Sequence, residues 1–375
     1  MQFIDLKSQQ NHLLHSGKTL REDINERIKT VLDHGQFILG PETSELESEL
    51  KEYVGVKHCI AVSSGTDALL LALMALEITT GDEVITTPFS FISTIETIQL
   101  LGAKPVFVDI NPTTYNIDHN SIEKNITSKT KAIIPVSLYG QTANFTEINK
   151  LAKNYQIPVI EDGAQSFGST HNGAKSCGLS TIGTTSFFPS KPLGCYGDGG
   201  ACFTNNDEIA EKIRRISTHG QIRRYEHVEV GINGRIDTIQ AAVLLAKLKI
   251  FHIEVQNRET IGSAYTNKLN DMNFHNTPYI EANNTSVYAQ YTVKVSNREK
   301  VQQLLKCEGI PTSIHYPKPL NRQKSYLKYL KSNNISLEMN NAYQASKSVL
   351  SLPMHPWLSS TDQDLIISKL LKSID

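Results

Sequence analysis

The stretch SFFPSKPLG, residues 186–194, is the most informative part of this 375-residue chain. It holds one lysine, Lys191, among small and apolar residues, and a glycine-rich run follows it up to residue 200. Upstream, the stretch VIEDGAQS at 159–166 begins as an apolar run and continues into Glu161, Asp162 and Gln165. Parallel sheets carry their sites at the carboxyl ends of strands. The two stretches therefore predict that Asp162 and Lys191 lie at one edge of a sheet.

These residue types suit one chemistry especially well. Apolar surroundings partly desolvate a lysine, which lowers the pKa of its amine and makes the amine a nucleophile. An aspartate beside a pyridine nitrogen keeps that nitrogen protonated, as in enzymes that use pyridoxal 5'-phosphate (PLP). The pattern indicates a Schiff base between Lys191 and PLP, with Asp162 at the ring nitrogen and Gln165 near the ring hydroxyl. From these residues alone, Asp162 could instead cap a helix, and Lys191 could be a surface lysine before a hairpin turn.

Other candidates have both a functional and a structural interpretation. The SSGT stretch at 63–66 lies between a predicted strand and a predicted helix, where it could bind the PLP phosphate or simply cap the helix. Ser186 could add a phosphate contact, and either Phe89 or Phe91 could stack on the ring or pack in the core. The remaining polar residues in loop-like segments look like surface or capping residues when taken alone: His219, Asn233, Arg235, His315 and Tyr316.

Strand and helix patterns alternate through the first 250 residues. Short β-rich runs predict strands at 58–62, 83–86, 105–108, 132–136, 159–160, 186–188 and 201–204. Helical patterns cover 15–34, 67–76, 93–101, 145–155, 207–216 and 238–255, and another follows Pro41. This alternation favours an α/β domain with a mainly parallel sheet over residues 15–250. Residues 251–375, with a strand at 288–295, a helix at 298–308 and a helix after Thr361, predict a smaller α+β domain on which residues 1–14 pack.

Composition narrows the class of protein. The net charge is −1 and charged residues make up 20% of the chain, so we expect neither nucleic acid nor an anionic membrane as a partner. Five scattered cysteines, none at metal-ligand spacing, favour reduced thiols in a cytoplasmic protein. The N-terminus lacks the apolar core of a signal peptide, and the apolar run at 69–76 is too short to span a bilayer.

Taken together, the motifs resemble the DegT/DnrJ/EryC1/StrS family of PLP-dependent sugar aminotransferases, which has the fold of aspartate aminotransferase (PLP fold type I). The resemblance runs from FIDL at residues 3–6 to SLPMHP at 351–356. The motifs that are specific in combination are SGTDAL at 64–69, VIEDGAQS at 159–166, SFFPSK at 186–191 and GINGRID at 231–237. Two positions depart from the commoner pattern without removing a reacting group: Gly163 in place of Ala, and Phe91 where relatives may carry Tyr or Trp.

The resemblance implies a role for each candidate. It implies that Lys191 forms the internal aldimine, that Asp162 pairs with the pyridinium nitrogen, and that Gln165 contacts the ring hydroxyl. Gly65, Thr66 and Ser186 would hold the phosphate, and Phe91 would stack on the ring. Asn233 would reach the cofactor phosphate of the neighbouring subunit, which makes a homodimer with shared active sites. Arg235, His315 and Tyr316 would line the nucleotide-sugar site.

Three further stretches are similar to one subgroup: HGQFILGP at 34–41, PSKPLGCYGDGG at 189–200 and HYP at 315–317. That subgroup moves an amino group from glutamate to the 3-keto position of a UDP-2-acetamido-2-deoxy-3-oxo-glucuronic acid in bacterial O-antigen biosynthesis. The alternatives are amination of another nucleotide-linked 3- or 4-keto-sugar, a PLP-dependent sugar dehydrase, and a non-catalytic PLP-binding regulator. The related dehydrases carry His in place of the Schiff-base lysine, so Lys191 argues against the second. The chain has no spare length for a DNA-binding domain, which argues against the third.

Overall fold

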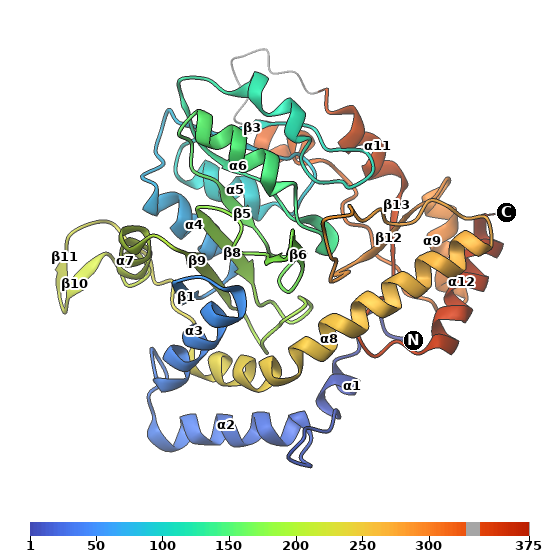
Figure 1. Cartoon of the computed structure of the whole chain (residues 1–375), viewed down its shortest axis with the longest axis horizontal. Helices are drawn as coiled ribbons and strands as arrows, with labels where there is room; N and C mark the ends of the chain where they lie inside the picture. Colours follow the sequence, from blue (N-terminus) through green and yellow to red (C-terminus); the bar gives the residue numbers. More distant parts are fainter. Residues whose placement is uncertain (328–337, 375) are drawn as a thin grey trace.

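The computed structural model describes residues 1–327 and 338–374 and shows a large sheet with helices on both faces (Figure 1). The sheet has two parts, ordered β3-β2-β4 and β5-β8-β9-β1, and parallel bridges from Ile133 to Val159 and from Val136 to Asp162 join β4 to β5. Strand β9 is antiparallel to both of its neighbours, whereas the β2 pairings and the β5–β8 pairing are parallel. The strands are β1 (His58–Val62), β2 (Glu83–Thr86), β3 (Lys104–Phe107), β4 (Thr130–Ile134), β5 (Ile160–Asp162), β8 (Ile182–Ser186) and β9 (Gly200–Thr204).

Both faces of this sheet are buried because alternate residues of each strand pack into different cores. Ile60 and Val62 of β1 pack with α4 and α7, whereas Cys59 and Ala61 pack with α3 and α8. Covered parallel sheets have this two-sided apolar pattern. The helices around the sheet are α2 (Leu20–His34), α3 (Pro41–Val54), α4 (Gly65–Ala75), α5 (Ser93–Leu100), α6 (Phe145–Asn154), α7 (Asp207–Ile216) and α8 (Thr238–Asp271).

Helix α8 continues past the sheet into a second group of elements (Figure 1). Its Tyr265 and Leu269 join an apolar cluster with residues of the antiparallel pair β12–β13 and of the helices α9 and α12. These elements are β12 (Tyr291–Lys294), β13 (Val349–Leu352), α9 (Arg298–Cys307) and α12 (Ser360–Ile374). The domain boundary expected at 250–251 falls inside α8 and stays a prediction, as does the assignment of residues 1–14 to the smaller domain.

The remaining elements are short. A hairpin of β10 (Gln221–Arg223) and β11 (Glu226–His227) projects from the body beyond α7 (Figure 1). The others are α1 (Leu6–Gln10), α10 (Lys324–Leu327), α11 (Asn340–Ser348), β6 (Thr170–His171), β7 (Ala174–Lys175), and the 3-10 helices η1 (His119–Ser121), η2 (Glu123–Asn125), η3 (Leu138–Gly140) and η4 (Leu320–Arg322). Among the described helices, none has both the length and the apolar composition needed to cross a bilayer.

Several predicted boundaries were wrong for local reasons. Helix α2 begins at Leu20 rather than at 15, because Thr19 and Glu22 form a capping box that starts the helix there. Helix α8 runs to Asp271 instead of ending at Val255. The strand expected at 186–188 is β8, which ends at Ser186; Phe187 then accepts a hydrogen bond from the Cys195 N–H as the chain turns into a loop.

Candidate active site

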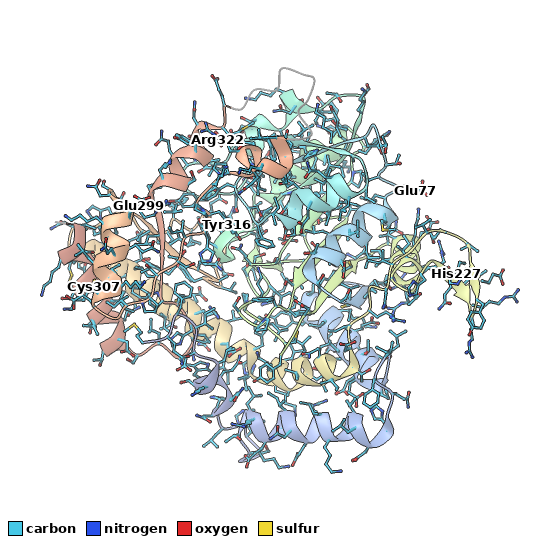
Figure 2. The ribbon with its side chains drawn as sticks, turned by 180° about the vertical axis from the view of Figure 1, so that it is seen from behind. Glu77, His227, Glu299, Cys307, Tyr316 and Arg322 are labelled. Atoms are coloured by element: carbon cyan, nitrogen blue, oxygen red, sulfur yellow. The ribbon has the colours of Figure 1, made fainter. Side chains whose placement is uncertain are left out.

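A cavity of about 490 Å³ lies where the parallel strands end, and most of the predicted site residues line it. Figure 2 labels one lining residue, Tyr316, near the centre of the view. The lining comes from segments far apart in sequence: Ser64, Gly65, Thr66, Leu69, Ser90, Phe91, Ser93, Val136, Asp162, Ala164, Gln165, Ser186, Phe188, Ser190, Lys191, Asp198, Gln290, His315 and Tyr316. The structure thus brings the two central stretches, 159–166 and 186–194, to one place.

Asp162 is the last residue of β5 and is only 4% exposed. Its Oδ2 accepts a hydrogen bond of 2.9 Å from the Thr94 hydroxyl, and its Oδ1 accepts one of 3.3 Å from the Ala164 N–H. Burial raises the pKa of Asp162, while the Thr94 hydrogen bond and the charge of Lys191 act in the opposite direction. Such a carboxylate gains from a further positive charge beside it.

Lys191 lies in the loop that follows β8, five residues after Ser186. Its backbone N–H donates to the Phe188 carbonyl oxygen at 2.9 Å, which fixes a turn at this point. Burial lowers the pKa of its amine, and the carboxylate of Asp162 partly offsets this effect. A lowered pKa raises the fraction of free amine near neutral pH, as a nucleophile or proton acceptor requires.

The start of α4 forms one wall of the cavity. Ser64 caps the helix, because its Oγ accepts a hydrogen bond of 3.0 Å from the Asp67 N–H. The N–H groups of a first helical turn have no partners within the helix and attract anions. At Gly65 an added Cβ would lie 2.6 Å from the Ser186 Cβ, so the absence of a side chain lets β8 approach the helix start. The capping interpretation is therefore correct for Ser64, and it is compatible with anion binding at Gly65 and Thr66.

Gln165, Tyr316 and His315 form a connected polar wall. The Gln165 Oε1 accepts from the Tyr139 N–H at 2.9 Å, and its Nε2 donates to the Tyr316 hydroxyl at 3.0 Å. The His315 Nδ1 lies 2.9 Å from the Ser351 hydroxyl. Burial, and next the charge of Lys191, lower the pKa of His315 to about 4, so this ring is neutral at pH 7.

The two candidate phenylalanines differ in their exposure and in their contact with the cavity. Phe89 is fully buried in a core cluster, whereas Phe91 is 54% exposed and lines the cavity. The Phe91 ring centroid lies 6.4 Å from that of Tyr316. Phe91 is therefore the one that can meet a planar ligand in the cavity.

Asn233 and Arg235 do not line this cavity within one chain. Asn233 is exposed and forms a β-bridge with Thr218, while Arg235 forms one with Val62 at the edge of β1. The Nε of Arg235 is buried and has no hydrogen-bond partner among the described residues. The predicted role of Asn233 concerned the neighbouring subunit, so both assignments stay predictions.

Three residues in or behind the site were not predicted from the sequence. Thr94 on α5 and the backbone of Tyr139 hold Asp162 and Gln165, respectively. Glu161 is fully buried beside Asp162, and its carboxylate accepts from the Ser176 hydroxyl at 2.6 Å. The sequence signal for Thr94 was a hydroxyl residue beginning a helix soon after Phe91, but only the fold shows which carboxylate it contacts.

The structure also explains the glycine at position 163. An added Cβ there would lie 2.6 Å from the Cys177 Sγ and 3.0 Å from the Thr184 carbonyl oxygen. The thiol occupies the space that an alanine methyl group would need. Gly163 therefore follows from the presence of Cys177 behind the strand.

These features together fit PLP. The start of α4 offers N–H groups to a phosphate, Phe91 offers a ring face, and Asp162 offers a buried carboxylate with unused acceptor capacity. Lys191 offers an amine of lowered pKa in the same cavity. Because Gly65 has no Cβ, the start of α4 can lie close to Ser186 at the end of β8.

Comparison of this chain with known proteins also indicates an aminotransferase that uses PLP. Residues 18–371 match the DegT/DnrJ/EryC1/StrS aminotransferase family. The chain is 52% identical over 370 residues to the UDP-2-acetamido-2-deoxy-3-oxo-D-glucuronate aminotransferase of Pseudomonas aeruginosa, covering 99% of each chain.

Two solved structures show how far the similarity extends in three dimensions. A DegT/DnrJ/EryC1/StrS aminotransferase from Brucella abortus aligns with a TM-score of 0.92 at 40% identity, covering 100% of this chain and 99% of that one. NtdA from Bacillus subtilis, solved with the cofactor PMP (pyridoxamine phosphate), aligns with a TM-score of 0.88 at 32% identity, covering 96% of this chain and 83% of that one. The predicted fold class is confirmed, and the chain belongs to the DegT/DnrJ/EryC1/StrS aminotransferase family.

Proposed function

We propose that this protein uses PLP to move an amino group from glutamate to the 3-keto carbon of a UDP-2-acetamido-2-deoxy-3-oxo-glucuronic acid. The observation that carries the proposal is the meeting of Lys191, Asp162, Gln165 and the α4 start in one cavity, in a chain 52% identical over nearly its full length to an enzyme named for this reaction. The product would serve surface polysaccharide (O-antigen) biosynthesis in the cytoplasm.

Each residue of the cavity has a task in this proposal. Bound PLP supplies an electron sink for proton removal from the carbon that carries the amino group. The Asp162 carboxylate holds the ring nitrogen in its protonated form, and Gln165 orients the ring through its hydroxyl. The N–H groups of Gly65 and Thr66, with the Ser186 hydroxyl, bind the phosphate.

Lys191 also moves the proton. When its amine is free, the Nζ takes the proton from the α-carbon of glutamate and, in the second half of the cycle, gives one to C3 of the sugar. Burial lowers the pKa of Lys191, which brings its ammonium and its free amine closer in free energy and so helps proton transfer in both directions. His315 and Tyr316 also line the cavity, where they would contact the sugar, and neutral His315 adds no charge there.

A homodimer with shared sites is part of the proposal. Asn233 lies outside its own chain's cavity, and apolar side chains are exposed on the nearby projecting segment: Ile222, Tyr225, Val228 and Val230. Figure 2 shows His227 at the outer end of this segment. Phe37, Ile38 and Leu39 are exposed as well, and Ile38 pairs with Asp237. Exposed apolar residues gathered in this way are typical of a subunit interface.

The substrate is tested most directly in reverse, because aminated sugars are more stable than 3-keto-sugars. The purified protein, with PLP and 2-oxoglutarate, is given UDP-2-acetamido-3-amino-2,3-dideoxy-glucuronic acid, and glutamate formation is measured. The matched compounds are the same UDP-sugar without the carboxylate on C5, and dTDP-linked 4-amino-sugars.

We expect turnover of the first compound to exceed the others at least about tenfold, because a site that binds a polar substrate group discriminates against an analogue that lacks this group. The Lys191→Ala variant serves as the control without catalysis. Preferential use of a 4-amino-sugar would contradict the proposed substrate. Lys191→Ala activity within tenfold of wild type would contradict the catalytic assignment.

A further inference from the structure

A second polar cluster lies behind the loop that carries Lys191. Three charged side chains on one face of α8, Lys247, Glu254 and Arg258, are at most 4% exposed. They border a small cavity that is separate from the candidate active site and is also lined by Pro189, Lys191 and Pro192. Lys191 lines both cavities, so the loop at 189–197, which we call the lysine loop, lies between them. Burying a charge costs several kcal/mol unless it is compensated, so such a cluster calls for an explanation.

Helix α8 holds the lysine loop at two neighbouring positions. The Lys247 Nζ donates a hydrogen bond to the carbonyl oxygen of Gly194, its one acceptor among the described residues. Seven residues earlier on the same helix, Gln240 accepts from the Tyr196 N–H at 2.8 Å and donates to the Tyr196 carbonyl oxygen at 3.3 Å. The Lys247 ammonium also lies 5.2 Å from the Tyr196 ring centroid. These contacts fix the chain three to five residues beyond Lys191.

The first ten residues of the chain complete the arrangement. The Gln9 Nε2 donates to the Glu254 Oε1 at 2.7 Å, and the Gln10 Nε2 donates to the Tyr196 hydroxyl at 3.0 Å. Glu254 in turn favours the charged form of Lys247, whose pKa burial lowers to about 8. Lys247 is therefore mainly charged at neutral pH, and α1 and α8 hold the loop from two sides.

We propose that Lys247 is a positioning residue, which together with Gln240 keeps the lysine loop, and hence the Lys191 amine, in place at the cofactor site. The inference rests on the proposed function only for its kinetic consequence. A misplacement of about 1 Å in a reacting group can cost about a hundredfold in rate. An apolar side chain could fill the volume of Lys247, but it could not donate to the Gly194 carbonyl oxygen.

The test compares Lys247→Met with Lys249→Met. Lys249 lies on the same helix, but it is solvent-exposed and pairs with Asp23 at 2.7 Å. Amide hydrogen exchange is followed by mass spectrometry on the full-length protein, with and without PLP, in peptides covering residues 186–198. We expect exchange in these peptides to become at least about tenfold faster in Lys247→Met, because the Cys195 and Tyr196 N–H bonds depend on the position of the loop. Lys249→Met should match the wild type.

Two controls separate positioning from general instability. Peptides covering β12 should exchange at wild-type rates in Lys247→Met, and Gln240→Leu should loosen the same loop without changing a buried charge. In the reverse assay we expect Lys247→Met to lose about tenfold to a hundredfold in kcat, with KM for the amino-sugar within about twofold.

Unchanged exchange in residues 186–198, acceleration that extends equally to β12, or a faster-exchanging loop with wild-type kcat would each overturn the inference. Wild-type protein that turns over no amino-sugar would overturn the proposed function, while the exchange comparison would still decide whether Lys247 holds the loop.

Discussion

At the scale of single residues, the site depends on opposite pKa shifts in two groups. Burial raises the pKa of Asp162 and lowers that of Lys191. The charge of each group partly offsets the pKa shift that burial causes in the other. Thr94 adds a hydrogen bond that favours the ionised form of Asp162. Asp162 thus suits a positively charged ring nitrogen, and Lys191 suits a carbonyl group at the other end of the same ligand.

Asp162→Asn should leave the shape of the cavity intact and remove the charge. A neutral amide cannot stabilise a protonated ring nitrogen, so we expect a loss of roughly 3 kcal/mol or more in transition-state stabilisation, on the scale seen when preorganised electrostatic groups are removed. The measurement is the single-turnover rate with glutamate and saturating PLP, with PLP content checked by mass. A variant that reacts at the wild-type rate would leave Asp162 with only a structural role.

Glu161 gives a prediction about pH and stability. Burial raises its pKa to about 7 from 4.5, despite hydrogen bonds from Ser176 and the Cys177 N–H that act in the opposite direction. A raised pKa in the folded state means that the group's stabilisation is complete below pH 4.5 and is lost as the pH rises through 7. Wild type relative to Glu161→Gln should therefore lose up to about 3 kcal/mol of unfolding free energy over this window.

Urea unfolding at a fixed protein concentration, at several pH values from 4.5 to 8, measures this difference. Gln can keep an acceptor toward the Cys177 N–H and place its amide donor toward the serine hydroxyl oxygens. A difference between the two proteins that stays constant with pH would show that Glu161 does not titrate in this range.

At the scale of elements, the phosphate site is a junction between the start of α4 and the end of β8. The approach of the two elements depends on Gly65, since a Cβ there would collide with Ser186. Ser64 keeps the helix start ordered by capping it. The junction is local, so it can be disturbed without touching Lys191 or Asp162.

Gly65→Ala should weaken PLP binding by roughly tenfold to a hundredfold, because relief of an overpacked contact typically costs about 1–3 kcal/mol. Binding of pyridoxal, which has no phosphate, should change much less. Both affinities can be measured by quenching of protein fluorescence. Equal weakening of the two ligands would point to a general distortion and would argue against a phosphate cradle at this position.

At the scale of the whole molecule, we expect each active site to be built from two chains. Asn233 is exposed and outside its own cavity, beside apolar residues that a partner would cover. Closed two-fold dimers form this kind of reciprocal interface. Mixing Lys191→Ala chains with Asn233→Ala chains, both expected to be inactive alone, would give heterodimers with one doubly damaged site and one intact site.

Activity should partly return on mixing, approaching about half of the wild-type activity per heterodimer. Differently tagged chains verify that subunits exchange, and the activity of Asn233→Ala alone is measured first. Confirmed exchange without recovery would mean that Asn233 acts within its own chain or not at all.

Local sequence determined much of this protein. Apolar periodicity predicted most strands and helices, and the strand-end positions of Asp162 and of the 64–66 stretch followed from it, because these signals act over a few residues. The sequence motifs also indicated the family. The predicted element boundaries were wrong where a local structure starts or ends the element, as at the capping box of Thr19 and the turn after Phe187.

Tertiary structure alone decided the long-range contacts. Only the fold places Thr94 against Asp162, Tyr139 against Gln165, and Phe91 rather than Phe89 in the cavity. The fold alone also shows the hydrogen bond from Lys247 to the Gly194 carbonyl oxygen, which no local sequence pattern indicates. A side chain's burial and partners depend on segments tens to hundreds of residues away, and these also set its pKa, because the energy of a charge depends on everything packed around it.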